Sequence, residues 1–406
     1  MMTMSNVCRR RVADIQQAIR EEPGLDGWLF YDFRHSDPLS YGVLLLDPGT
    51  HVTRRWYYWI PADGTPIKLV HGIEPHILDS LPGERRCYVS WRDQQAALQL
   101  ALQSARRIAM QYSPANAIPY VSRVDAGTID LVRKFGVDVV TSADLVQQFE
   151  AVWDAQQLDS HGVAAEGLRR IVDEAFDQVG SKVNRAEPFG EYELQQFIMS
   201  RFQQCGLVTS HPPIAAVNQH SADPHYTPSP NTSWPIGPGD LVLIDLWAKQ
   251  PFPGAVYADI TWTGYVGAST PDRYQRIFQI VRSARDTALA FVRERVRAGN
   301  FPCGWEVDDV CRQVIQEAGY GDRFIHRTGH SIGVEVHGNG ANIDNLETED
   351  GRRLRPCTCF SIEPGIYLPG EFGIRSELDV YVSSNDAVVY GLPLQTEIVT
   401  IPVQAP

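Results

Sequence analysis

The chain has 406 residues, a formal net charge of −13, 43% hydrophobic residues and 21% charged residues. These values are typical of a folded globular protein and exclude a disordered chain, and the length favours two domains. The acidic balance opposes nucleic-acid binding, because phosphate contacts need concentrated Lys and Arg. No apolar run approaches the roughly 18 residues of a membrane-spanning helix, so no membrane partner is expected.

Cysteine usage and the amino-terminal segment indicate a reducing compartment. The seven cysteines are odd in number and lack a Cys-x-x-Cys spacing, which argues against a disulfide framework. The segment "MMTMSNVCRRRVADIQQAIREE" is basic but has no apolar core of the kind found in secretory signals. We therefore expect a cytoplasmic protein.

Two regions with different patterns of predicted secondary structure follow one another along the chain. Residues 1–155 alternate strand-like and helix-like segments, such as "LDGWLFYDF" and "RDQQAALQLALQS", which predicts a small α/β domain. Residues 156–406 contain two pairs of amphipathic helices, and each pair leads into a β-rich segment. The helices are expected at 160–179, 191–206, 270–299 and 305–319. This order predicts a duplicated α+β unit.

A first carboxylate pair lies in "LVLIDLWAKQPFPGAVYADITWTGYVG", residues 241–267. Two β-prone runs flank the turn-forming segment "QPFPG". If the turn centres near residue 252, antiparallel pairing places Asp245 directly opposite Asp259 on one sheet face. Two like charges in that position are unfavourable unless a cation lies between them.

A second hairpin, "CFSIEPGIYLPGEFGIRSELDVYV", repeats this arrangement. Its turn at Pro369–Gly370 lies midway between Glu363 and Glu377, so these two glutamates are also expected to face each other. Acidic side chains within apolar strands are costly to bury without partners. Two such hairpins in one chain favour a cation site over two isolated turn-capping acids.

Three of the 11 histidines fall in "HRTGHSIGVEVHGNGAN", residues 326–342. The residues alone leave open whether these histidines bind a metal, act as bases or belong to a glycine-rich loop. Four carboxylates and one histidine suit a dinuclear site for divalent ions of intermediate hardness, such as Mn, Co or Zn.

The motifs "LVLIDLWA", "YADIT", "HRTGHSIG", "VHG", "FSIEPGIY" and "GIRSELDV", in this order, resemble the metallopeptidases of the pita-bread fold. This group includes methionine aminopeptidase, aminopeptidase P and prolidase. The resemblance covers roughly residues 156–400, and the preceding α/β region resembles the N-terminal domain of the prolidase and creatinase branch. It implies two divalent ions per chain, with Asp259 and Glu377 bridging both ions. The implied metal ligands are Asp245, Asp259, His330, Glu363 and Glu377.

The same resemblance implies catalytic and substrate-binding roles. Glu363 would accept a proton from the attacking water, and His225 of "PHY" and His337 would contact the substrate carbonyl. Arg375 would lie beside the site, and His326 in an outer or substrate-facing position. His220 has no counterpart and is expected to be a surface loop residue.

Several positions depart from the family pattern. Trp247 stands where relatives commonly have glycine, and the hairpin between Asp245 and Asp259 is three residues longer than usual. Val256 occupies the position of a common tyrosine, and Gly338 that of a frequent acid. These departures leave the ligand set intact and concern substrate orientation.

The implied activity is hydrolysis of Xaa-Pro bonds, in dipeptides, by a homodimer. Three alternatives remain: an aminopeptidase P-like enzyme for longer peptides, a metal-free creatinase-like enzyme, and a non-catalytic binding protein. Retention of all five ligands weighs against the last two. The aromatic segment "RRWYYWI" at 54–60 is interpreted either as sheet core or as a wall closing the substrate cleft.

Overall fold

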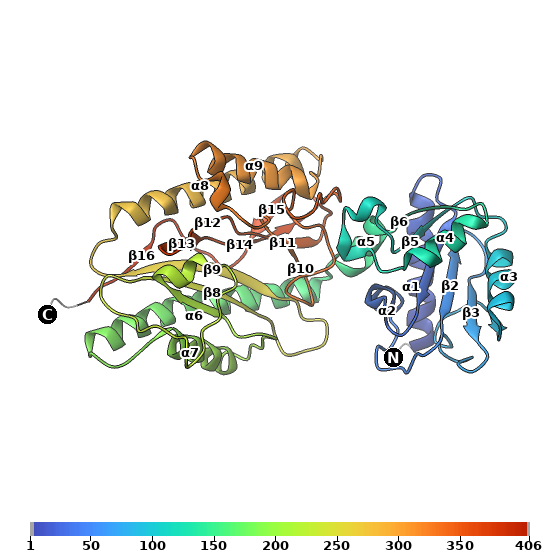
Figure 1. The fold of residues 1–406 in the computed structure, drawn as a ribbon, viewed down its shortest axis with the longest axis horizontal. Coiled ribbons are helices and arrows are strands. Elements are labelled where there is room, and N and C mark those ends of the chain that lie inside the picture. Colours follow the sequence, from blue (N-terminus) through green and yellow to red (C-terminus); the bar gives the residue numbers. More distant parts are fainter. Residues whose placement is uncertain (1–3, 404–406) are drawn as a thin grey trace. The chain divides into compact units, whose positions relative to one another are not determined.

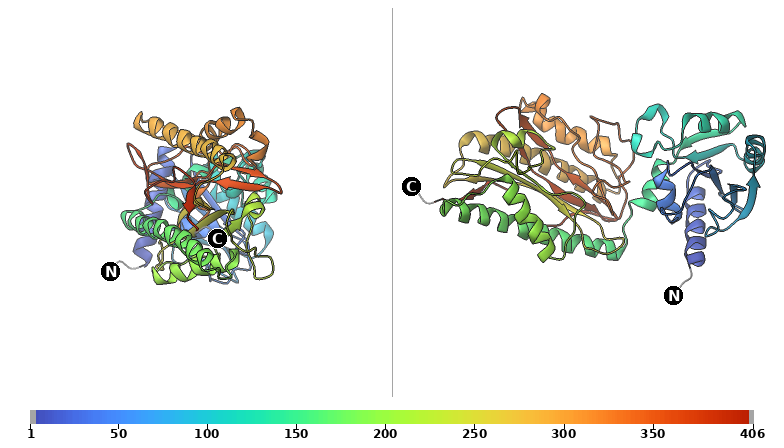
Figure 2. Two further views of the ribbon diagram at one scale, coloured as in Figure 1. Left: turned by 90° about the vertical axis from the view of Figure 1, so that its left-hand side faces the viewer. Right: turned by 60° about the horizontal axis from the view of Figure 1, so that its bottom comes forward.

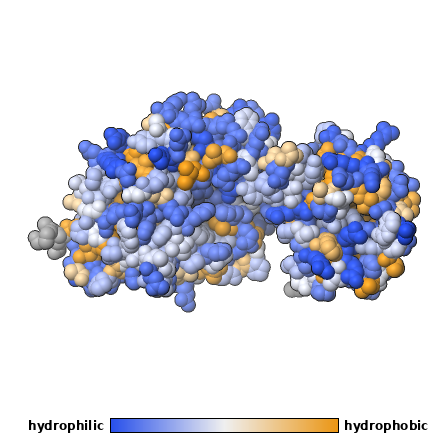
Figure 3. All heavy atoms as spheres, in the orientation of Figure 1, coloured by the Kyte–Doolittle hydropathy of each residue, from blue (hydrophilic) through white to orange (hydrophobic). Residues whose placement is uncertain are grey.

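The computed structural model describes residues 4–403 and divides into two compact bodies, residues 1–150 and 151–406. None of the described helices is long and apolar enough to cross a membrane. On the face seen in Figure 3, each body is mainly hydrophilic with scattered hydrophobic groups.

The first body is built on one mixed six-stranded sheet with the order β4-β3-β2-β1-β5-β6. Its strands are β1 Gly27–Asp32, β2 Trp56–Pro61, β3 Ile67–His71, β4 Glu84–Tyr88, β5 Arg107–Met110 and β6 Asp138–Thr141. Its α-helices are α1 Met4–Glu21, α2 Pro38–Leu44, α3 Trp91–Ala101, α4 Ala126–Lys134 and α5 Ala143–Glu150. Helices α1, α2 and α5 supply one hydrophobic core, and α3 and α4 supply the other.

The aromatic strand β2 lies inside this sheet. Trp56, Tyr58 and Ile60 belong to one core, and Tyr57 and Trp59 to the other. This alternation is the period-two pattern of a strand that is buried on both faces. Within the body the segment is therefore sheet core.

The second body contains four α-helices and ten strands within the described residues. Its helices are α6 Ala155–Asn184, α7 Glu191–Gln204, α8 Asp272–Arg297 and α9 Gly304–Glu317. The first half contributes β7 Ile214–Val217, β8 Leu241–Ala248 and β9 Ala258–Val266. The second contributes β10 Ser331–Ile332, β11 Thr358–Ile362, β12 Gly365–Leu368, β13 Phe372–Arg375, β14 Leu378–Val382, β15 Ala387–Val389 and β16 Val399–Ile401.

The two halves repeat one plan. Helices α6 and α7 precede an antiparallel β7-β8-β9 ladder, and α8 and α9 precede an antiparallel β10-β11-β14 ladder. The strands lie between the two helix pairs, as two views show (Figures 1 and 2). The apolar face of α6, formed by Ala164, Leu168, Ile171, Ala175 and Val179, is buried against the first sheet. The predicted duplicated α+β unit is therefore present.

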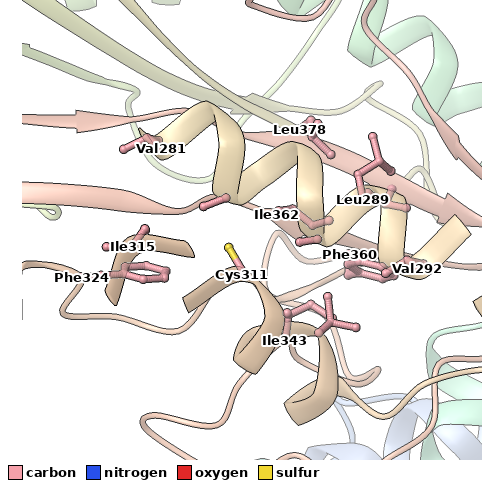
Figure 4. Close-up of a cluster of buried hydrophobic side chains, with 14 of the residues drawn as sticks. Val281, Leu289, Val292, Cys311, Ile315, Phe324, Ile343, Phe360, Ile362 and Leu378 are labelled. Atoms are coloured by element: carbon pink, nitrogen blue, oxygen red, sulfur yellow. The ribbon is translucent and has the colours of Figure 1, made fainter. Parts of the chain in front are cut away.

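The core of the second half fixes β11 and β14, which flank the site described below. In Figure 4, Leu289 of α8 and Cys311 of α9 lie with Phe360 and Ile362 of β11 and Leu378 of β14. The cluster is fully buried. Because interiors are close-packed, the positions of these two strands are tightly determined.

Gly329 holds the histidine-bearing segment against β11. Its N–H donates to Ile343 O (3.1 Å), and Ile343 N–H donates back to Gly329 O (3.0 Å). A Cβ atom at Gly329 would lie 1.9 Å from the backbone oxygen of Ser361. The close approach of two backbones at this point requires glycine.

Gly329→Ala is therefore expected to destabilise the second body by about 1–3 kcal/mol or more, because the added methyl group must push two backbones apart. Urea unfolding monitored by circular dichroism measures the change. Gly351→Ala is the matched control, since a Cβ there meets nothing within 4 Å. Equal midpoints for the two variants would contradict the close-packing argument.

Candidate metal centre

The β8–β9 hairpin places its two aspartates on one sheet face but not directly opposite each other. Asp245 pairs with Thr261, and Asp259 pairs with Trp247. The expected direct pairing is wrong by two residues, because the hairpin centres at residue 253 rather than 252. Since the displacement is even, the aspartates remain diagonal neighbours on the same face, within reach of a shared ion.

Glu363 and Glu377 face each other as expected, at a break between two ladders. Ile362 pairs with Leu378 in one ladder and Gly365 with Arg375 in the next, so both ladders are symmetric about residue 370. Within the break, Glu363 N–H donates to Thr328 O (2.8 Å) and Glu377 N–H to Thr261 O (3.3 Å). These bonds tie the two glutamates to the histidine segment and to β9.

The five residues assigned as ligands converge at one place. Ligand atoms of Asp259, His330 and Glu377 all lie within 4.8 Å of one another. His330 Nε2 lies 3.4 Å from Glu363 Oε1 and 3.7 Å from Asp259 Oδ2. The hydroxyl of Thr261 lies 3.0 Å from Asp245 Oδ1 and 2.7 Å from Glu377 Oε2. Residues from both halves therefore form a single cluster.

The donor set fits divalent metal ions. Asp259 Oδ1 and Glu377 Oε1 are buried and have no hydrogen-bond partner within the described part of the chain. Buried carboxylate oxygens without partners are strongly unfavourable, and a cation would satisfy them. The two orphan oxygens belong to the residues that the resemblance assigns as bridging ligands.

The electrostatics of the protein alone oppose ionisation of this cluster. Burial, and then the charge of Asp245, raise the pKa of Asp259 well above its ordinary value. Burial and the neighbouring carboxylates do the same for Glu377, and burial raises the pKa of Glu363 to about 7. Burial lowers the pKa of His330, which favours the neutral imidazole that binds metals. A bound cation would lower the pKa values of these carboxyl groups and so favour their ionised forms.

Arg375 partly compensates the negative charge. Its buried guanidinium forms an ion pair with Asp245, and Nε donates to the Thr261 hydroxyl at 3.1 Å. Nη1 donates to the hydroxyl of Tyr367 at 3.1 Å. One permanently charged group thus fixes the outer side of the carboxylate cluster.

His326 braces this arginine through Tyr367. The Tyr367 hydroxyl lies 2.8 Å from His326 Nε2, while His326 Nδ1 lies 2.7 Å from Arg327 O. Since a backbone oxygen only accepts, Nδ1 carries the proton and Nε2 accepts from Tyr367. Burial and the charge of Arg375 lower the pKa of His326 to about 3, so the ring is neutral. These bonds connect His326 to Arg375 through Tyr367, and the residue also lines the pocket described below, so its outer or substrate-facing role stays a prediction.

His225 and His337 are exposed and line the same pocket as the carboxylates. The ring of His337 lies 4.3 Å from that of His330. His225 follows Pro224, whose carbonyl accepts a bond from Arg375 Nη1 (3.4 Å). Both side chains are available to a ligand.

All nine residues singled out by the resemblance line one pocket of about 400 Å³. Trp247, Ile214 and Val336 add an apolar wall to it, and Arg327 adds a cation. The volume lies toward the small end of the range for small-molecule sites.

The expectation for His220 is wrong. Its side chain is only 19% exposed, and Nδ1 lies 2.9 Å from Oε1 of the buried Glu191. Glu191 also accepts bonds from Tyr226 Oη (2.6 Å) and Trp234 N–H (2.8 Å). A buried carboxylate collects donors, and here it anchors the loop that carries His225.

Sequence reasoning also missed Asp379, which accepts the backbone N–H of Asp259 at 2.8 Å. Its Oδ2 lies 3.8 Å from Nε2 of the fully buried His161. The sequence contained a signal for this residue, because Asp379 is an acid within an apolar strand, just as Glu363 directly follows one. Such a carboxylate orients a ligand without binding the ion.

The chain belongs to metallopeptidase family M24, whose model matches residues 164–384. An Xaa-Pro dipeptidase of Lactobacillus delbrueckii subsp. lactis is 34% identical over 216 residues, which cover 53% of this chain and 52% of that protein. An Xaa-Pro dipeptidase of Lactobacillus helveticus is 30% identical over 246 residues, 60% of each chain. The chain thus spans about half to three fifths of the length of these curated relatives.

Solved structures resemble the whole chain. Dipeptidase PepE from Mycobacterium ulcerans has a TM-score of 0.70 at 25% identity and covers 98% of this chain and 99% of its own. A prolidase from Thermococcus sibiricus has a TM-score of 0.62 at 22% identity, with coverage of 96% and 98%. An X-Pro aminopeptidase from Thermotoga maritima has a TM-score of 0.55 at 23% identity, and the match covers 93% of this chain and 98% of that chain. The predicted fold, a pita-bread domain preceded by a smaller α/β domain, is confirmed.

Loss of the carboxylate of Glu377, one of the two residues that the resemblance assigns as bridging ligands, is expected to remove metal binding. Mn²⁺ should raise the thermal unfolding midpoint of the wild type, because a ligand that binds only the native state stabilises it. Glu377→Gln should abolish this rise and lower the metal content measured by elemental analysis. Glu371→Gln is the matched control, an exposed acid on the same hairpin. Full metal content in Glu377→Gln would contradict the assignment.

Proposed function

We propose that the protein is an Xaa-Pro dipeptidase that works with two divalent ions, Mn, Co or Zn, as a homodimer in the cytoplasm. The observation that carries the proposal is the convergence of five ligand residues with His225, His337 and Arg375 in one pocket of about 400 Å³. The Xaa-Pro dipeptidases among the relatives support the substrate class.

Asp259 and Glu377 would hold both ions, Asp245 one of them, and His330 and Glu363 the other. Divalent ions in such a set supply Lewis-acid catalysis and lower the pKa of the attacking water. Two orphan carboxylate oxygens support this division of ligands. Arg375 keeps Asp245 in place and limits the repulsion among the carboxylates.

Glu363 is the proposed general base. It lines the pocket and is partly exposed, so its carboxylate can accept a proton and pass it on. His225 and His337 would donate hydrogen bonds to the carbonyl oxygen as negative charge develops on it. Their exposure in the pocket that the carboxylates also line supports this role.

Proline is read by shape and charge in this proposal, because the imide has no N–H. A dipeptide ends in a carboxylate directly after the proline, and Arg327 gives the pocket a cation that suits it. The small volume supports a dipeptide over a longer peptide. The fold does not distinguish a dipeptidase from an enzyme for longer peptides, since a solved X-Pro aminopeptidase has the same fold.

The metal-loaded protein is expected to hydrolyse Ala-Pro with a higher kcat/KM than Ala-Pro-Ala, because the longer peptide extends past the pocket. Steady-state kinetics on both peptides test this. A preference for Ala-Pro-Ala of tenfold or more, about 1.4 kcal/mol in transition-state binding, would assign the protein to the aminopeptidase class. Absence of hydrolysis of every Xaa-Pro peptide would favour a non-catalytic binding protein.

His337→Ala is expected to lower kcat about ten- to a thousandfold, as loss of one oxyanion donor does, with metal content near that of the wild type. Kinetics on Ala-Pro and elemental analysis on the same preparation give the two readouts. His51→Ala, an exposed histidine in the first body, controls for the substitution itself. Loss of metal together with activity would make His337 a ligand.

A further inference from the structure

We propose that the indole of Trp247 limits the size of the side chain on the amino-terminal side of the scissile bond. The proposal rests on the proposed function and adds a substrate preference to it, namely small residues before proline. It concerns a residue whose type was unexpected at this position, since relatives commonly have glycine there.

The register of β8 and β9 places Trp247 beside the metal ligands. It follows Asp245 by two residues on one strand face, and it pairs directly with Asp259 across the hairpin. Opposed side chains share a face, with Cβ atoms about 4.5–5.5 Å apart. The indole therefore borders the carboxylate cluster, and it lines the pocket.

The ring is held from both sides. One apolar cluster against it contains Ile214 and Leu243, and another contains Val256 and Ile332. Packing between two clusters leaves a large, flat side chain few alternative rotamers. Trp247 is thus a fixed wall rather than a movable flap.

The segment that carries Val336, another residue of the apolar wall, is held in place as well. Lys249, at the start of the β8–β9 loop, donates a hydrogen bond to Val334 O (2.5 Å), two residues before Val336. Its ammonium also lies 4.8 Å from the centroid of the Tyr257 ring. The longer hairpin therefore holds the segment that carries Val336, which packs against the same apolar cluster as Trp247.

The indole acts by shape. Its Nε1 is buried and has no acceptor among residues 4–403. A donor shielded from solvent in this way offers no hydrogen bond to a substrate. Trp247 thus presents apolar ring surface to whatever enters the pocket.

Charge decides which substrate residue meets this wall. Asp245 and Asp259 are the polar neighbours of Trp247 on its sheet face, so the indole borders the proposed ion centre, where the scissile carbonyl of the peptide would bind. The carboxylate end suits Arg327, which comes from a different segment of the pocket lining. The scissile carbonyl belongs to the residue before proline, so the side chain of this residue meets the indole.

The test compares Ala-Pro with Phe-Pro as substrates of the metal-loaded enzyme. The wild type should favour Ala-Pro in kcat/KM by at least about tenfold, the scale of steric discrimination in apolar pockets. Trp247→Ala should bring this ratio to about one or reverse it, because the added space admits the phenyl ring. Trp247→Phe keeps an aromatic wall without the buried N–H and should retain a ratio above one.

The metal content and the thermal unfolding midpoint of each variant are measured in parallel. If Trp247→Ala fails to fold, Trp247→Leu replaces it, because the leucine side chain is closer in volume to tryptophan. A wild-type preference for Phe-Pro overturns the proposal, as does an unchanged ratio in the smaller variant. Faster hydrolysis of alanyl-pipecolic acid by Trp247→Ala, with the Ala-Pro to Phe-Pro ratio unchanged, would place the indole beside proline and also overturn it. Failure of the wild type to cleave any Xaa-Pro peptide would instead refute the proposed function.

Discussion

Four carboxylates buried in one cluster set the main constraint on this structure. Asp259 and Glu377 each keep one oxygen without a partner in the part of the chain that the structure describes, and burial raises the pKa of both. Such a cluster is unfavourable in a protein alone, since each charge loses its hydration and repels the others. Cation binding therefore contributes to the free energy of folding as well as to chemistry.

The surrounding structure pre-organises the carboxylates in spite of this repulsion. Asp245 is held by Arg375, and the backbone of Asp259 by Asp379. Glu377 is held through Thr261, which touches it with both its carbonyl and its hydroxyl oxygen. Groups of this kind fix ligand geometry before the ion arrives, so less reorganisation is needed on binding.

The duplicated architecture explains how one cluster draws on both halves of the second body. Asp245 and Asp259 lie on the hairpin that follows α6 and α7, whereas His330, Glu363 and Glu377 lie beyond α8 and α9. Each half buries its helices against its own strands, which leaves the strand faces between the helix pairs for the site. The proposed substrate contacts come from loops, such as the one anchored by Glu191 that carries His225. The assigned ligands thus lie within strands or next to strand ends, whereas His225 lies on a loop.

The sequence by itself determined the ligand types, the symmetry of the second hairpin and the apolar helix faces, because these follow from local periodicity and charge placement. It put Asp245 opposite Asp259 and was wrong by two residues, since the centre of a long loop depends on how the loop packs. It left His220 on the surface, because only the folded chain brings it to Glu191. Asp379 beneath Asp259, and Trp247 between two apolar clusters, were likewise decided by tertiary structure. Those contacts join strands and loops that are far apart in the chain, and the local sequence pattern does not predict which distant segments come into contact.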